Sequence, residues 1–231
     1  MSDNVCVPTS LKSAIMNPYM VITYHDGECV KISQGELTLA FNPPAKESST
    51  KVAKFGADIV LTSFAHEDFN GVDTASIGDK KPFVISGPGE YDVKGVTVRG
   101  FGSPAEYDKE KSVNTIYEVL LEGFTLCFLG TMSAEELPLE AKQDIADDID
   151  VLFLPIGGEG VLDYASAYKL AVKLGPKLIV PIHYGAIGQK DALKLFLKEA
   201  GAEDVKPIDR LTIKKKDVEG KEAEVVVLEA N

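Results

Sequence analysis

Short hydrophobic runs separated by turn residues dominate the first half of the chain, which is the pattern of β-strands. Asp26-Gly27 and Gln34-Gly35 separate the first runs, and Glu122-Gly123 separates the last two so closely that a tight hairpin is predicted. The run over 58–62 is continuously apolar after its aspartate, as expected for a strand buried on both faces. The predicted strands of this half cover 19–23, 29–33, 36–41, 58–62, 82–86, 95–99, 114–121 and 124–129.

Helical patterns enter in the second half and alternate with buried strands. We predict helices over 133–145, 163–174 and 190–200, the first capped by Ser133 and the other two ended by Gly175 and Gly201. Further strands are predicted over 151–155 and 178–182, and a final hairpin over 211–215 and 223–228. Antiparallel strands followed by strand–helix alternation predict an α/β protein with helices on its outer faces, in one domain spanning residues 1–231.

The composition is that of an ordinary globular protein. The chain has 231 residues, of which 45% are hydrophobic and 26% charged, and no apolar run approaches the roughly 20 residues of a membrane helix. The first residues lack the basic and apolar regions of a secretory signal. Cys6, Cys29 and Cys127 are odd in number and far apart, which favours free thiols in a reducing compartment. We therefore expect a cytoplasmic protein.

The charge balance is strongly acidic, with a formal net charge of −12. Such a surface repels the phosphates of nucleic acid, so nucleic acid is not expected as a partner. The one basic cluster, Lys214 to Lys216, lies beside Asp217 and Glu219 and is interpreted as a solvated strand end or turn.

The stretch from Ala57 to Gly71 carries the most informative motif, in which a buried strand runs into a loop with a histidine and an aspartate two positions apart. It resembles the hallmark of the metallo-β-lactamase superfamily, a strand that ends in a His-x-His-x-Asp-His loop whose side chains bind two metal ions. That resemblance places Phe64, His66, Asp68 and Phe69 at the four ligand positions. Zinc prefers nitrogen and oxygen donors, and a phenyl ring offers neither.

Other segments extend the resemblance over the chain from Tyr19 to Tyr184, in the same order as in the family. They look like the branch that contains L-ascorbate-6-phosphate lactonase-like Zn-dependent hydrolases, with the stretch from Ser86 to Val96 as the most specific match. The resemblance implies a four-layer αββα sandwich. The matching segments are 22–29, 38–43, 86–96, 114–117, 150–158 and 179–184.

The remaining metal-ligand positions of the family are mostly substituted. Pro104 lies where the resemblance implies a histidine, and Thr131 stands at the bridging aspartate. His183 keeps its position, so the residual ligands are His66, Asp68 and His183. In the family the first belongs to one metal and the other two to the second, which leaves each site without the three protein ligands that catalytic zinc normally takes.

Four more residues with chemically reactive side chains lie near these motifs. His25 is interpreted as a surface turn histidine, with a swing toward the site as the alternative. Cys29 is expected to pack structurally, and Glu67 and Glu90 are acidic residues near the site that are not family ligands. Nucleotide-binding loops and a Gly-x-Ser-x-Gly elbow do not occur in the sequence.

These observations lead to two hypotheses. In the first, the chain is a pseudoenzyme that retains the fold to bind a small molecule or a partner protein and holds no metal tightly. In the second, Asp68 and His183 hold one zinc or manganese ion, and Asp68 serves in the hydrolysis of an ester, lactone or phosphoester. A structural subunit of an oligomer is a third possibility, for which the sequence shows no interface pattern.

Overall fold

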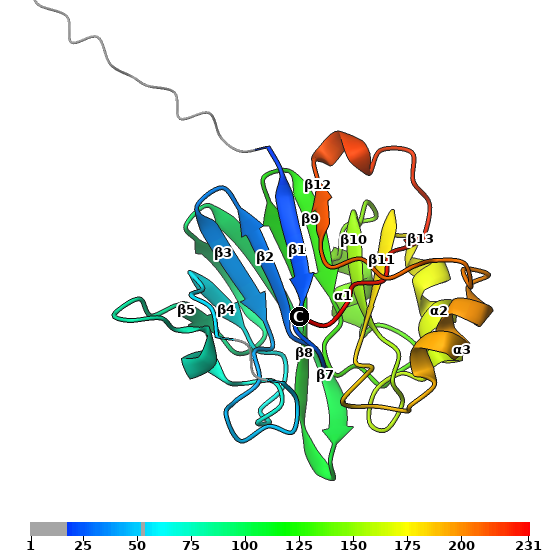
Figure 1. Ribbon diagram of the computed structural model, residues 1–231, viewed down its shortest axis with the longest axis horizontal. Helices are drawn as coiled ribbons and strands as arrows, with labels where there is room; N and C mark the ends of the chain where they lie inside the picture. The colour runs from blue at the N-terminus through cyan, green and yellow to red at the C-terminus, as the bar shows by residue number, and fades with distance from the viewer. Residues whose placement is uncertain (1–17, 52–53) are drawn as a thin grey trace, which may run out of the picture.

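Two β-sheets pack face to face, as the computed structural model shows for residues 18–51 and 54–231 (Figure 1). Cys6 lies outside the described residues. The first sheet has the strand order β12-β1-β2-β3-β4-β5 and the second the order β13-β11-β10-β9-β8-β7-β6. The first contains β1 (Met20–Tyr24), β2 (Val30–Gln34), β3 (Leu37–Phe41), β4 (Ile59–Leu61), β5 (Phe83–Ile85) and β12 (Leu211–Ile213). The second contains β6 (Gly89–Val93), β7 (Val96–Tyr107), β8 (Glu110–Leu121), β9 (Phe124–Phe128), β10 (Val151–Pro155), β11 (Leu178–Ile182) and β13 (Glu224–Val225).

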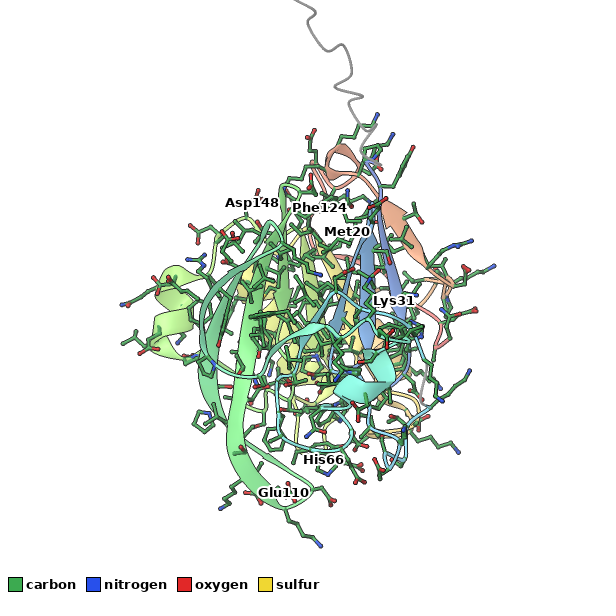
Figure 2. The ribbon with its side chains drawn as sticks, turned by 90° about the vertical axis from the view of Figure 1, so that its left-hand side faces the viewer. Met20, Lys31, His66, Glu110, Phe124 and Asp148 are labelled. Carbon is green, nitrogen blue, oxygen red and sulfur yellow. The ribbon has the colours of Figure 1, made fainter. Side chains whose placement is uncertain are left out.

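The β7–β8 hairpin is much longer than its sequence pattern predicts. Pairing continues from Thr97 opposite Leu120 to Tyr107 opposite Glu110, and the turn is made by Asp108 and Lys109. The outer part of this hairpin escaped prediction because its residues are mostly polar. Figure 2 shows Glu110 near the hairpin tip at the same end of the molecule as His66, with Met20 and Phe124 at the opposite end.

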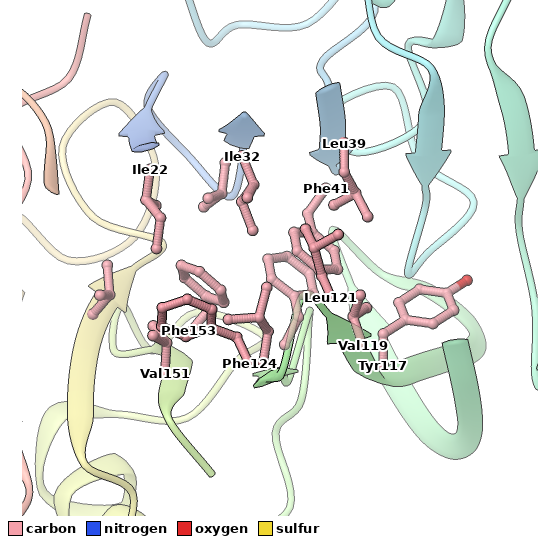
Figure 3. Close-up of a cluster of buried hydrophobic side chains, with 14 of the residues drawn as sticks. Ile22, Ile32, Leu39, Phe41, Tyr117, Val119, Leu121, Phe124, Val151 and Phe153 are labelled. Atoms are coloured by element: carbon pink, nitrogen blue, oxygen red, sulfur yellow. The ribbon is translucent and has the colours of Figure 1, made fainter. Parts of the chain in front are cut away.

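The main core fills the space between the sheets (Figure 3). Phe41 of β3 stacks on Phe128 of β9, with ring centroids 4.4 Å apart and planes 5° apart. The side chains of β1 and β2 alternate between buried and less buried positions, so one face of each strand enters this core. β10 and β11 are buried throughout, because helices cover their second face.

Helices α1 (Leu139–Asp144), α2 (Tyr164–Leu174) and α3 (Ala192–Glu199) cover the outer face of the second sheet (Figure 1). Over the first sheet the outer layer consists of loops and the short 3₁₀ helix η1 (Val72–Ala75), packed on Cys29 and Ala40. Another 3₁₀ turn, η2 (Lys215–Asp217), follows β12. The predicted α/β sandwich is confirmed, and the thinner layer lies over the first sheet.

Two predicted elements are wrong. The helix expected over 133–145 is confined to α1, because Pro138 restricts the residue before it to extended backbone and caps the helix instead of Ser133. The tail does not form a hairpin, since β12 pairs with β1 in the first sheet and β13 with β11 in the second. A pattern of two short strands cannot reveal that they join different sheets.

Candidate functional site

The predicted ligand positions gather at one end of the sandwich, where loops leave the strands of both sheets. The loop after β4 carries Phe64, His66, Asp68 and Phe69, and the segment after β11 begins with His183. The turn between β1 and β2 and the tip of the β7–β8 hairpin reach the same end (Figure 2). Thus the structure brings together residues that are more than 100 positions apart in the sequence.

His183 is held in a buried hydrogen-bonded network. Its Nδ1 lies 2.7 Å from Oε1 of Glu28, and both side chains are fully buried. Asn42 donates from Nδ2 to Oε2 of Glu28 at 2.6 Å and to Oγ of Ser63 at 2.7 Å. The backbone of His183 has a φ of 59°, which a non-glycine residue seldom adopts. We name this network the hydrogen-bonded wall. Its members are Glu28, Asn42, Ser63 and His183, together with Asn114 and Thr131, whose hydrogen bonds are described next.

Thr131, at the expected bridging-aspartate position, forms neutral hydrogen bonds. Its backbone N–H and its hydroxyl both donate to Oδ1 of Asn114, at 2.9 and 3.1 Å. Asn114 in turn donates to the carbonyl of Leu129 at 2.9 Å. Gly130, between Leu129 and Thr131 in the sequence, has a φ of +59°. A Cβ at this position would lie 2.5 Å from atoms of Asn114 and of Ser63. The backbone therefore approaches this wall more closely than any residue with a side chain allows.

Aromatic rings fill the space opposite the wall. The ring of Tyr107 lies 4.8 Å from that of Phe69, 5.0 Å from His66, 5.6 Å from His183 and 6.4 Å from Phe64, in each case steeply inclined. Edge-to-face geometry of this kind is favourable for aromatic pairs. Phe64, Phe69 and Tyr107 are buried together with Ala105 and Ile187. We name the rings of Phe64, His66, Phe69, Tyr107 and His183 the aromatic cluster.

Asp68 is bound by hydroxyl groups. Ser48 donates to its Oδ1 at 2.5 Å, and Tyr107 donates to its Oδ2 at 3.0 Å. Nδ1 of His66 lies 3.4 Å from the same Oδ2 and accepts the backbone N–H of Asp68 at 3.2 Å. Burial, followed by the charge of Asp68, raises the pKa of the Tyr107 hydroxyl well above its usual value, so this hydroxyl stays a proton donor.

The donors present do not fit a di-metal centre. No group of three or more His, Cys, Asp or Glu side chains converges anywhere in the described residues. Both oxygens of Asp68 accept hydroxyl protons, and two of the expected ligands are phenylalanine. One feature points the other way: Nε2 of His183 is buried and has no hydrogen-bond partner among residues 18–51 and 54–231.

The other residues near these motifs make none of the contacts described above. His25 is buried, not on the surface, and stacks on Phe55 at 5.1 Å. Cys29 packs in a small buried cluster where burial raises the pKa of its thiol to about 12, as expected for structural packing. Glu67, Glu90 and Pro104 are exposed. Pro104 is on the outer face of β7, because alternation turns Ser103, Ala105 and Tyr107 inward.

Glu28, Asn42, Asn114 and Tyr107 are the site residues that sequence reasoning missed. Glu28 follows the Asp26-Gly27 turn and has the appearance of a solvated turn residue, although it directly precedes Cys29 and a buried strand. That position, an acid at the entrance to a buried run, was the available signal. Tyr107 offered none, since the strand that carries it was predicted to end at Arg99.

The chain is similar in sequence to one family along most of its length. Residues 21–183 match the family described as “Beta-lactamase superfamily domain”. A Lysinibacillus sphaericus protein called “UPF0173 metal-dependent hydrolase” is 27% identical over 197 residues, which cover 71% of this chain and 85% of that protein. A protein of the same description from Anoxybacillus flavithermus is also 27% identical, over 194 residues that cover 71% of this chain and 86% of that protein.

Solved structures show the same architecture. A Thermotoga maritima protein, assigned to the metallo-β-lactamase superfamily as a proposed Zn-dependent hydrolase, superimposes with a TM-score of 0.69 and 25% identity. The match covers 90% of this chain and 98% of that one. The fold is therefore the metallo-β-lactamase fold. Within the described part of the chain, no helix is both long and apolar enough to span a membrane.

Proposed function

We propose that this chain, which belongs to the β-lactamase superfamily domain family, works as a pseudoenzyme that uses the fold as a binding module and holds no di-metal centre. The carrying observation is that Tyr107 stands among the expected ligand positions, with its ring against Phe69, His66 and His183 and its hydroxyl on Asp68. The related proteins are named metal-dependent hydrolases, so the proposal sets this chain apart from them. Membership of the ascorbate-6-phosphate lactonase-like branch stays a prediction.

Physical chemistry supports this reading at both sides of the site. Catalytic zinc normally takes three protein ligands and keeps an open position for water. Here a metal ion would have to displace the phenol ring and break the bonds of Ser48 and Tyr107 to Asp68. Thr131 offers a neutral hydroxyl that is already bonded to Asn114 in place of a bridging carboxylate. Apart from Nε2 of His183, the polar groups described at this site are hydrogen-bonded to one another.

The second candidate is a hydrolase with a single zinc or manganese ion, and Nε2 of His183 favours it. A buried nitrogen without a hydrogen-bond partner costs about 1–3 kcal/mol, and a metal ion would remove that cost. The Nδ1 contact with Glu28 resembles the carboxylate–histidine pairing that orients metal ligands. Asp68 would then complete the site and act on an ester, lactone or phosphoester.

Metal analysis of the purified full-length protein separates the two candidates. Protein from zinc- or manganese-supplemented cultures is expected to hold less than about 0.1 metal ion per chain, because two or three donors without preorganisation bind weakly. His183→Ala and Asp68→Ala should leave this value unchanged. Near-stoichiometric metal that is removed by a chelator, and lost in both variants, would establish the single-metal hydrolase and overturn the proposal.

A further inference from the structure

The tip of the β7–β8 hairpin places one side chain, that of Tyr107, inside the aromatic cluster. Beyond the pair of Ser103 and Asn114 the inner row of β7 consists of Ala105 and Tyr107, each 8% exposed, whereas residues 110–113 of β8 are exposed. Tyr107 is the last residue of its strand, directly before the turn. The hydroxyl of Tyr107 meets Asp68 at 3.0 Å while four rings surround its own ring.

The surroundings of Tyr107 have the composition of a ligand site. The hydroxyl of Tyr107 meets Oδ2 of Asp68 and its ring lies among four other rings, so the surroundings offer contacts to both parts of a phenol. A hydrogen bond to a charged acceptor distinguishes a phenol from a plain hydrocarbon ring. Aromatic contacts with a few placed polar groups are typical of small-molecule pockets.

We propose that the space bounded by Phe64, His66, Phe69, His183 and Asp68 is a binding site for a phenolic ring, which Tyr107 fills from its own chain as a displaceable plug. This inference rests on the proposed function and names the ligand class of the binding module. An external phenol binds when the hairpin tip lifts, taking over the ring contacts and the hydrogen bond to Asp68.

Three features make the tip displaceable. A two-stranded ribbon such as the outer part of the β7–β8 hairpin has marginal stability by itself in water. Its position against the rest of the molecule therefore depends on its inward side chains. Asp108 and Lys109 both have positive φ, at 46° and 67°, and such backbone is unfavourable for a lysine. With the plug in place, Nε2 of His183 has no hydrogen-bond partner in the described residues, and water or a ligand reaching it on opening offsets part of the lost contacts.

The backbone around the tip fits a docking surface. Gly160 has a φ of +107°, and a Cβ at that position would lie 3.0 Å from the carbonyl oxygen of Glu106 and 3.2 Å from Cδ2 of Tyr107. The loop after β10 therefore contacts the plug through bare backbone, without a side chain that would lock it. Phe64 also lines a surface pocket of about 300 Å³, together with Asn70, Pro88 and Val113, so one wall of the ring site borders solvent-accessible space.

Removing the plug tests the ligand class. Full-length Tyr107→Ala is titrated with p-cresol and with toluene in the presence of a chelator, and binding is read by calorimetry. We expect p-cresol to bind at least about 10-fold tighter than toluene, the ratio given by a hydrogen bond to a buried charged acceptor. Adding Asp68→Ala should abolish that ratio. Equal affinities for the two probes, or no binding of p-cresol to the folded variant, would overturn the proposal.

The unaltered chain tests displacement, and this arm stands even where Tyr107→Ala fails to fold. Amide hydrogen exchange of residues 103–112 is followed with and without p-cresol, and Tyr107→Phe serves as the matched variant that keeps the ring but loses the hydroxyl. Exchange at the tip should accelerate with p-cresol, at lower concentrations in Tyr107→Phe than in the native chain, while β9 is unaffected. Unchanged exchange at the tip in both proteins, or acceleration throughout the chain, contradicts a local plug. Neither arm involves metal, so failure here is distinguishable from failure of the proposed function.

Discussion

The two sides of the candidate site are held together by different physical means. On the side of the loop after β4, phenylalanines stand at the ligand positions expected from the resemblance, and the space is filled by aromatic packing around Tyr107. On the side of the hydrogen-bonded wall, amides and hydroxyls occupy it, and Glu28 binds both Asn42 and His183. Packing tolerates changes of shape that cost a few contacts, whereas a buried polar network becomes unfavourable as soon as one member is missing. The wall should therefore be the more sensitive side.

The largest effect is expected for Glu28→Ala in the wall. Truncation leaves the donor of Asn42 and the ring of His183 without their buried acceptor. Each buried polar group without a partner costs about 1–3 kcal/mol, so we expect the free energy of unfolding to fall by about 4 kcal/mol in all. Glu28→Gln keeps the shape of the side chain and one acceptor oxygen, so it should lower the free energy of unfolding clearly less than Glu28→Ala does. Urea unfolding measures both, with the exposed Glu67→Ala as the control within about 0.5 kcal/mol of the native chain. A loss below about 1 kcal/mol for Glu28→Ala would show that the wall is not a coupled network.

Phe69→Ala tests the aromatic side of the site. We expect it to lower the free energy of unfolding by about 3 kcal/mol. Phe69 is fully buried, and deletion of a buried phenyl ring removes its packing and leaves a cavity. Phe69→Leu refills most of the space and should recover more than half of the loss. Should Phe69→Leu be as damaging as Phe69→Ala in urea unfolding, specific ring geometry would matter more than volume.

A histidine that belongs to neither side provides a pH reference. Burial, with a smaller effect of Lys31, lowers the pKa of His25 from 6.5 to about 4. The unfolded chain therefore binds more protons between these two values, so this contribution to stability is complete above pH 6.5 and is lost as the pH falls toward 4. We expect the free energy of unfolding to fall by up to about 3 kcal/mol over that window, and His25→Gln to flatten the slope. An unchanged slope in His25→Gln would assign it to other groups.

The smallest effect belongs to Thr131→Val. This near-isosteric change removes the hydroxyl bond to Asn114 but keeps the backbone N–H bond to the same oxygen. The expected cost is about 1 kcal/mol, the net contribution of one neutral hydrogen bond. Thr131→Asp, which returns the family's carboxylate to a buried site, should be worse because it adds a charge without a partner. Greater stability of Thr131→Asp in the presence of zinc would indicate that the wall can still accept metal.

The fold was more accessible from sequence than the site. Strands such as 20–24, 59–61 and 151–155 follow from apolar runs and turn dipeptides, which act locally. The expected ligand positions in the loop after β4 could be located because they lie beside such a strand. Glu28 and His183, by contrast, are 155 positions apart, and their contact depends on how β1 and β11 are placed in different sheets. Tyr107 was inaccessible because the polar outer part of its hairpin has no hydrophobic pattern.

Thermal unfolding of the native chain with and without metal tests the central claim most directly. At 100 µM zinc or manganese we expect the midpoint Tm to stay within about 1 °C of the value in chelator, because the donor set binds neither ion tightly. A site with a Kd of about 1 µM would instead add about 2.7 kcal/mol of stability at this hundredfold excess. For a chain of this size that gain raises Tm by about 5–10 °C. Such a rise, absent from His183→Ala and Asp68→Ala, would show that the aromatic cluster and the wall have not replaced the metal.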